Sequence, residues 1–483
     1  MHIAWLLLLG TSLVSPSAAA LTLQKRDAPA VVGLNIGRKD VDDPVGRDRL
    51  RRRNGQTVGQ GLDNEKSLYF CNITIGTPGQ HLRLVLDTGS SDLWCNAADS
   101  TLCSSPGDHC GVSGSYDAKS SSTYTHISTD FNISYADGTG AAGEYVSDTL
   151  HIGDVSIKDF QFGLGQTSDS PEGVLGIGYT SNEVQVVINN KDTYPNLPQA
   201  MVKDGLINSN AYSLWLNDLD ANTGSILFGG VDTEKYHGKL ETLPVQKVNG
   251  EYSQLIIALT GVTFSSASSR HRYSTSALPT AVLLDSGSTL TYLPNSLVED
   301  IYKDLPIVYD SLSGAGYVPC NLINDNINIT YTFSSPEITV NIKELIINAG
   351  DLYFRDGTRA CVFGIAPAGR STAVLGDTFL RSAYVVYDLA NNEISLANTN
   401  FDSTSSNILE IGGADKNLPG ATPVSNPVTS VAVGGSGARI GGITGSGTIS
   451  TQVPSEGAAP TVFVPTGTLE YLAFSLICWW YLA

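Results

Sequence analysis

The chain has 483 residues, of which 41% are hydrophobic and 16% are charged. This composition predicts a globular protein with enough apolar side chains for two sizeable cores or one large bilobal unit. The 47 acidic residues outnumber the 28 basic ones and give a formal net charge of -19. Because nucleic acids bind proteins through basic surfaces, this balance argues against a nucleic-acid partner.

The first 20 residues predict a signal peptide. Residues 6–9 are leucines within an apolar stretch, and the alanines at 18–20 offer small side chains for cleavage. The next segment is rich in basic residues and contains Lys25-Arg26 and Arg51-Arg52-Arg53. Both runs are candidate sites for a dibasic processing protease, so residues 21–53 are predicted to be a prosegment.

Residues 69–399 predict a mostly β structure. Short runs of Val, Ile, Thr, Tyr and Phe alternate there with Gly, Asn, Asp and Pro, which is typical of strands and turns. Helical spacing of apolar residues is clearest at 297–305. A second short helix is expected to begin near Pro198 and to stop before Gly205.

The last 83 residues differ from the rest of the chain. Residues 401–457 are rich in Ser, Thr, Gly, Pro and Val with few charges, a composition that predicts a flexible stalk. The terminal apolar run at 471–483 is shorter than the roughly 20 residues of a spanning helix. We therefore expect 458–483 to be a removed glycosylphosphatidylinositol signal, with attachment at Gly457 at the cell surface; the alternative is a plain hydrophobic terminus.

An internal repeat carries the most specific signal in the sequence. The run Leu86-Asp87-Thr88-Gly89-Ser90 is echoed by Leu284-Asp285-Ser286-Gly287-Ser288. The glycines of a second pair, Val174-Leu175-Gly176 and Val374-Leu375-Gly376, follow these aspartates at nearly matched intervals. One Asp-Thr-Gly is common at ordinary turns, but two co-spaced sets indicate a duplicated lobe.

These motifs resemble those of pepsin-like aspartic peptidases over roughly residues 69 to 399, and the tail resembles that of the fungal yapsin and candidapepsin group. Ser286 stands where the family more often has threonine, which keeps the hydroxyl. The resemblance implies a mostly β, bilobal fold with two six-stranded-barrel-type lobes and a cleft between them. The peptidase domain is expected at 54–400, with lobes at about 66–240 and 241–400.

The resemblance assigns Asp87 and Asp285 as the catalytic pair of an endopeptidase that acts on protein or peptide substrates at acidic pH. Two carboxylates about 3 Å apart cannot both ionise easily, and aspartic proteases are the established example of such a pair sharing a proton. The pair would activate a water that attacks the scissile carbonyl, without a metal or organic cofactor. The neighbouring hydroxyls and glycines can orient the carboxylates and contact substrate. These are Thr88, Ser90, Ser286, Ser288, Gly89 and Gly287.

Residues 133–140 resemble the family's flap, a hairpin that closes over substrate. Tyr135 would lie above the aspartates, and Trp94 is its expected hydrogen-bond partner. Asp137, Gly138 and Thr139 would form the turn, which follows an alanine where the family usually has glycine. The acidic surface and the aspartate in this turn suggest cleavage near Lys or Arg, as in yapsins.

Seven cysteines in a chain that enters the secretory pathway predict disulfides and not metal thiolates. The second-lobe pair matches a bridge of the family, whereas the four first-lobe cysteines allow three connectivities. The seventh cysteine lies in the anchor signal. The expected pairs are Cys320–Cys361, Cys103–Cys110 and Cys71–Cys95. Sequons for N-linked sugar begin at Asn72, Asn132 and Asn328.

Other classes of protein fit less well. A catalytically dead, wall-attached protein could keep this fold, but the sequence retains both aspartates. The sequence contains neither the Gly-x-Ser-x-Gly of a serine hydrolase nor the His-Glu-x-x-His of a zinc protease. One chain supplies both aspartates, so a monomer is expected.

Overall fold

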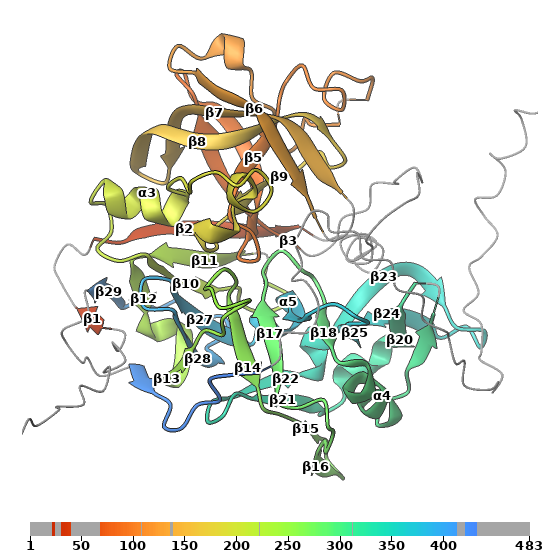
Figure 1. Cartoon of the computed structure of the whole chain (residues 1–483). Coiled ribbons are helices and arrows are strands. Elements are labelled where there is room, and N and C mark those ends of the chain that lie inside the picture. Colours follow the sequence, from red (N-terminus) through yellow and green to blue (C-terminus); the bar gives the residue numbers. More distant parts are fainter. Residues whose placement is uncertain are drawn as a thin grey trace, which may run out of the picture.

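The computed structural model describes residues 22–24, 30–39, 68–107, 109–135, 139–221, 223–311, 313–412 and 421–431. These residues are mostly β. Figure 1 shows residues 68–176 gathered in one lobe and residues 256–375 in a second lobe. A layer of strands from both halves of the chain joins them, as the bilobal prediction requires.

The first lobe is a closed barrel of six strands. Their order is β3-β4-β9-β5-β8-β7, and β7 pairs back onto β3 at Thr74↔His151. Alternate residues of β4, Leu82, Leu84 and Leu86, fill the core, as period-2 patterning dictates. The strands are β3 (Leu68–Ile75), β4 (Gln80–Asp87), β5 (Leu93–Asn96), β7 (Gly140–Ile152), β8 (Val155–Ser168) and β9 (Gly173–Gly176), with β6 (Thr125–Ser134) outside β7.

The same sheet continues past β3 into the layer between the lobes. Its strands come from distant parts of the sequence, and β27 and β28 belong to the last part of the second half. In sheet order they are β2 (Val32–Lys39), β11 (Thr223–Phe228), β10 (Ala211–Trp215), β27 (Ala383–Asp388), β28 (Glu393–Thr399), β13 (Tyr236–Pro244) and β30 (Ala421–Pro423).

The second lobe repeats the pairing pattern of the first. In the first lobe β4–β9 and β5–β8 are parallel and β5–β9 is antiparallel. The matching pairs of the second lobe, β17–β26, β18–β25 and β18–β26, have the same directions. This confirms the duplicated unit predicted from the motifs. The strands are β14 (Ile256–Leu259), β17 (Thr280–Leu284), β18 (Thr291–Leu293), β25 (Ile365–Pro367) and β26 (Ala373–Leu375).

Two four-stranded sheets complete the second lobe. One contains β15 (Gly261–Ser265), β16 (Arg270–Arg272), β21 (Asn328–Thr332) and β22 (Glu337–Asn341). The other contains β19 (Val308–Asp310), β20 (Ala315–Pro319), β23 (Ile346–Tyr353) and β24 (Arg359–Phe363).

Helices are short. The two predicted ones are confirmed as α3 (Leu197–Lys203) and α4 (Asn295–Lys303), and α4 buries Leu297, Val298 and Ile301 on one face. No helix of the described residues is long and apolar enough to cross a membrane. The remaining helices are α2 (Val184–Val187), α5 (Asp377–Leu380), η1 (Ala118–Ser120), η2 (Thr180–Asn182), η3 (Thr233–Lys235), η4 (Cys320–Asn324) and η5 (Ile342–Leu345).

Part of the predicted prosegment is a central strand of the fold. β2 lies between β11 and β3 and pairs with both, at Val32↔Phe228 and Gly37↔Phe70. Val32, Leu34 and Ile36 alternate along β2 and are all buried. The basic residues around this segment predict processing sites, whereas its alternating apolar side chains place it in the sheet.

The prediction of a flexible stalk from residue 401 is wrong for the described part of that segment. Residues Ile408–Gly412 form β29, which pairs with β12 (Gly230–Asp232) and with β1 (Thr22–Gln24). Ile411 is buried, and the Ala30 nitrogen donates to Glu410 Oε2 at 3.0 Å. A few apolar side chains within a Ser- and Thr-rich stretch are sufficient to pack it against the lobes. Residues 413–420 and 432–457 lie outside the described residues.

Candidate active site

Each aspartate of the repeat lies at the end of a strand in the middle of its lobe. Asp87 ends β4 and pairs with Gly176 of β9, and Asp285 directly follows β17. A Cβ on Gly176 would lie 2.6 Å from the Ser91 nitrogen, and one on Gly376 would lie 2.4 Å from the Ser288 oxygen. The glycine that ends each Val-Leu-Gly therefore lets the aspartate loop lie directly on the neighbouring strand.

The Asp87 carboxylate is held on both oxygens by its own loop. The Gly89 nitrogen donates to Oδ1 at 2.8 Å, and Ser90 Oγ donates to Oδ2 at 2.8 Å. The side chain is fully buried. Hydrogen bonds of this kind favour a fixed orientation of the carboxylate plane.

Asp285 is held by the same two bonds from the second lobe. The Gly287 nitrogen donates to Oδ1 at 2.9 Å, and Ser288 Oγ donates to Oδ2 at 2.7 Å. A Cβ on Gly89 would lie 2.5 Å from Asp285 Oδ1, so the Asp285 carboxylate lies against the backbone of the first-lobe loop. The structure thus brings the two predicted aspartates together from residues distant in the sequence.

The two loops are also bonded reciprocally to each other. The Thr88 nitrogen donates to Ser286 Oγ at 3.1 Å, and the Ser286 nitrogen donates to Thr88 Oγ1 at 3.0 Å. Thr88 Oγ1 donates onward to the Leu284 oxygen at 2.9 Å, and Ser286 Oγ donates to the Leu86 oxygen at 3.0 Å. Every donor and acceptor in these four hydrogen bonds is buried. This reciprocal bonding, called the interlock below, fixes one loop relative to the other. The serine performs the same bonding as the threonine.

The predicted flap is a hairpin made by β6 and β7. The strands pair through Ser134↔Gly140, and the Tyr135 nitrogen donates to the Thr139 oxygen at 2.8 Å. Trp94 Nε1 donates to the Tyr135 hydroxyl at 2.5 Å, as expected from the resemblance. Both rings are buried, and the hydrogen bond between them ties the flap to the strand that follows Asp87. The predicted turn residues Asp137 and Gly138 lie outside the described residues.

A second group of acidic residues lies behind the flap, and sequence reasoning missed its role. Asp92 Oδ1 accepts from the hydroxyls of Tyr145 and Tyr194, both at 2.9 Å, and Oδ2 accepts from the Val184 nitrogen at 2.9 Å. Glu183 is fully buried and accepts from the Tyr194 nitrogen at 2.9 Å. Burial, with the charge of Asp92 as a lesser cause, raises the pKa of Glu183 to about 9.

The segment after Val374-Leu375-Gly376 supports the second aspartate loop. The Asp377 nitrogen donates to the Ser288 oxygen at 2.9 Å. Arg381 at the end of α5 is fully buried, and its Nε donates to Glu344 Oε2 at 2.7 Å. This charge pair anchors α5 to the body of the second lobe, and removing one partner would leave the other charge buried.

The disulfide predictions are confirmed in two cases and wrong in the third. Cys103–Cys110 and Cys320–Cys361 are bonded, with Cα atoms 5.2 and 5.0 Å apart. Cys71 and Cys95 are free, buried thiols. They lie on β3 and β5, which face each other across the barrel with two strands between them on either side. A disulfide needs Cα atoms roughly 5.5 Å apart, which residues on strands that are not neighbours in the barrel do not readily provide.

The predicted glycosylation sites differ in how exposed their asparagine side chains are. Asn72 and Asn132 are exposed, whereas Asn328 is half-buried and its Oδ1 accepts from Asn341 Nδ2 at 3.0 Å. Gly457 lies outside the described residues. Within the described part of the chain, no cluster of three His, Cys, Asp or Glu side chains is placed to hold a metal ion.

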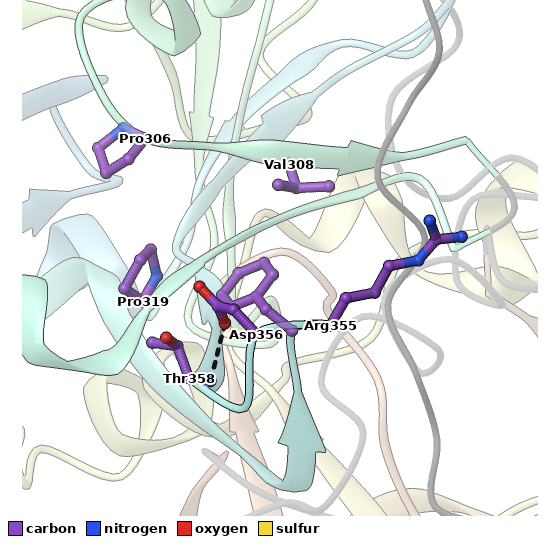
Figure 2. Close-up of a pocket in the computed structure, with 7 residues that line it drawn as sticks. Pro306, Val308, Pro319, Arg355, Asp356 and Thr358 are labelled. Carbon is purple, nitrogen blue, oxygen red and sulfur yellow. Dashed lines mark hydrogen bonds between the residues drawn. The ribbon is translucent and has the colours of Figure 1, made fainter.

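A separate cavity of about 330 Å³ lies in the second lobe. It is lined mainly by apolar side chains from the β19, β20 and β23–β24 region (Figure 2). Asp356 Oδ1 accepts from the Thr358 nitrogen at 2.9 Å in its wall. None of the lining residues belongs to the aspartate loops or the flap, so this cavity is not part of the site described above.

Comparison with known proteins identifies the family. Residues 68–399 match the eukaryotic aspartyl protease family. The probable aspartic-type endopeptidase opsB of Aspergillus oryzae is 69% identical over 471 residues, covering 97% of this chain and 96% of that protein. Aspartic proteinase yapsin-3 of Saccharomyces cerevisiae is 37% identical over 362 residues, covering 72% of this chain and 69% of that protein.

A solved structure supports the fold independently. The crystal structure of aspartic proteinase from Irpex lacteus superposes with a TM-score of 0.58 at 19% identity, covering 78% of this chain and 100% of that one. Secreted aspartic protease 4 of Candida albicans is 35% identical over 408 residues, covering 83% of this chain and 91% of that protein. The chain therefore belongs to the eukaryotic aspartyl protease family and is an aspartic-type endopeptidase.

Proposed function

We propose that Asp87 and Asp285 share one proton and together activate a water for attack on the scissile peptide bond. One carboxylate takes a proton from the water while the carbonyl oxygen receives the shared proton, and the leaving amine is protonated when the intermediate collapses. The observation that carries the assignment is the reciprocal bonding of the Thr88 and Ser286 loops. It supports a fixed relation between the two carboxylates, which a shared proton requires.

The test is hydrolysis of a mixed peptide library by the processed protein, alongside Asp87→Asn and Asp285→Asn variants. Each amide keeps the shape of the carboxylate but cannot take up the water proton. We expect each substitution to lower kcat at least about a thousandfold, with folding unchanged by circular dichroism. A tight-binding transition-state analogue of aspartic peptidases should also abolish wild-type activity. Correctly processed wild-type protein without activity would support a non-catalytic surface protein instead.

The proposal includes an acidic working range. The two aspartates retain a shared proton more readily at low pH. Buried carboxyl groups elsewhere in the fold also keep their protons more readily at low pH, which stabilises the folded protein there. Burial, with Asp388 as the lesser cause, raises the pKa of Glu393 to about 7, and burial also raises that of Asp388. Activity is expected to peak between about pH 3 and 6. A peak above neutrality would contradict this part.

We also propose a preference for Lys or Arg beside the scissile bond. The net charge of -19 favours association with basic peptides, and Asp137 in the flap turn offers a carboxylate close to the substrate by resemblance. The test compares peptides that differ only in Lys or norleucine at single positions around one cleavable bond. Higher kcat/KM for lysine in wild type, lost in Asp137→Asn, is expected. Equal rates for both peptides would remove the preference.

The route to the cell surface is part of the same proposal. The signal at 1–20, the dibasic sites and the removed signal at 458–483 together suggest a processed, lipid-anchored monomer on the membrane or in the wall. Because β2 is paired on both edges, we expect maturation at Lys25-Arg26, so that the removed prosegment is shorter than residues 21–53 and β2 stays in the active enzyme. N-terminal sequencing of secreted protein tests the cut, and release by a phosphatidylinositol-specific phospholipase tests the anchor. A mature form without residues 32–39 would contradict retention of β2.

A further inference from the structure

The proposed chemistry uses the two aspartates and the flap, and it assigns no role to Asp92 behind the flap. Asp92 lies five residues after Asp87 and two before Trp94, in the same turn and strand region. Its side chain is fully buried, and it bonds the tyrosines of an apolar cluster that includes Trp94, Tyr135 and Tyr145. A buried carboxyl group is costly unless each oxygen is hydrogen-bonded.

Asp92 joins three segments that are separate in the sequence. Through Oδ1 it accepts from Tyr145 on β7, which is the return strand of the flap hairpin. Through the same oxygen it accepts from Tyr194, and through Oδ2 from the first nitrogen of α2. Its backbone oxygen accepts from the Gly176 nitrogen at 3.1 Å, which fixes it to the strand beside the catalytic loop.

The contact to β7 is continued toward the flap by aromatic packing. The ring of Tyr145 meets that of Phe131 edge-on, with centroids 5.2 Å apart and planes at 78°. Phe131 lies on β6, the outgoing strand of the hairpin, four residues before Tyr135. Such edge-to-face pairs add directional attraction to the burial of the rings. The hairpin is thus held at its tip by Trp94 and at its base through Tyr145.

We propose that Asp92 is a positioning residue for the flap, acting through Tyr145 and not by contact with substrate. The inference rests on the proposed catalytic pair and flap. Two hydroxyls donate to the same oxygen at the same distance of 2.9 Å, but only one belongs to the hairpin. This pair of tyrosines offers a matched test.

The test compares Tyr145→Phe with Tyr194→Phe. Each variant removes one hydroxyl from Asp92 Oδ1 and leaves the ring in place. A hydrogen bond to a charged acceptor corresponds to roughly tenfold or more in an equilibrium constant. We expect Tyr145→Phe to lower kcat/KM and transition-state-analogue affinity by roughly tenfold. Tyr194→Phe should change both by less than about twofold, although both variants lose thermal stability to a similar extent.

Amide hydrogen exchange of residues 129–135 gives a second readout that requires no activity. Faster exchange there in Tyr145→Phe, and not in Tyr194→Phe, is expected because only the first variant loosens the hairpin. Equal losses of kcat/KM in both variants, or wild-type behaviour of Tyr145→Phe in both readouts, would overturn the proposal. An inactive wild type would refute the proposed catalytic function, while the exchange comparison would still decide the role of Asp92.

Discussion

Glu183 makes a quantitative prediction about stability and pH. Its side chain is fully buried, Oε2 accepts from the Tyr194 nitrogen, and Oε1 is buried with no hydrogen-bond partner. Its pKa is raised from 4.5 to about 9 in the folded protein, first by burial. The unfolded chain releases this proton near the ordinary value, whereas the folded chain retains it. Unfolding therefore becomes easier as pH rises through this interval.

The size of the effect follows from the two pKa values. Between pH 4.5 and about 9, each pH unit lowers the free energy of unfolding by about 1.4 kcal/mol for one proton. From pH 5 to pH 7 the loss from Glu183 is about 3 kcal/mol, a large fraction of the roughly 5 to 15 kcal/mol typical of a folded protein. Below about pH 4.5 both states are protonated and the contribution of Glu183 no longer changes.

The perturbation is Glu183→Gln, which keeps an acceptor for Tyr194 but carries no charge at any pH. Urea unfolding at pH 4, 5, 6 and 7, in an Asp285→Asn background that prevents self-digestion, measures its stability against the unsubstituted chain. We expect the variant to gain about 3 to 3.5 kcal/mol relative to the unsubstituted chain between pH 4 and pH 7. The exposed Glu251→Gln serves as the control and should show no such gain. A stability difference between the Glu183→Gln variant and the unsubstituted chain that stays the same at all four pH values would refute the reasoning.

Three further predictions concern the interlock, the C-terminal flank and the thiols. Ser286→Ala removes a buried donor and acceptor from the bonding between the two aspartate loops. It should lower the free energy of unfolding by about 2 kcal/mol and kcat at least about tenfold, whereas Ser286→Thr should retain wild-type values of both. Ile411→Ala should lower the free energy of unfolding in urea by about 2 to 4 kcal/mol, because the Ile411 side chain is buried. The control Ile408→Ala, at a half-buried side chain, should lower it by less than about 1 kcal/mol. Equal losses would mean that β29 does not pack against the rest of the protein. In protein lacking residues 458–483, a thiol reagent should detect two free thiols, Cys71 and Cys95, and only after the protein is denatured without reductant. A count of no free thiols would restore the third disulfide.

The local sequence was sufficient to predict the two matching aspartate loops, because their conformation requires particular residues in consecutive positions. Asp87 needs an apolar strand before it and a glycine after it, and the second copy at Asp285 confirms that the pattern is not accidental. The pairing of β4 with β9 and of β17 with β26 then follows from the repeated Val-Leu-Gly. Trp94 and Tyr135 were matched through the family resemblance, and periodicity alone would not have joined them.

Predictions failed where the decisive contacts are distant in sequence. Composition suggested a stalk after residue 400, yet Ile411 packs because β12 and β1 offer strand edges to β29. The predicted Cys71–Cys95 bond is wrong because the two residues lie on strands at opposite sides of a closed barrel, which cysteine spacing does not reveal. The sequence predicts no role for Asp92, because its partners Tyr145 and Tyr194 are distant along the chain.

The group behind the flap connects the pH dependence of local stability with the geometry of the site. Asp92 and Glu183 both bond Tyr194, one through its hydroxyl and the other through its backbone nitrogen. A second negative charge in this buried place would repel the first, so the arrangement is most stable while Glu183 keeps its proton. Raising the pH therefore weakens the same segment that supports Tyr145 and the flap. Because local opening of this segment releases the Glu183 proton, opening becomes easier as pH rises from 4.5 toward about 9, and Glu183→Gln should retain flap protection in hydrogen exchange to a higher pH than the unsubstituted chain.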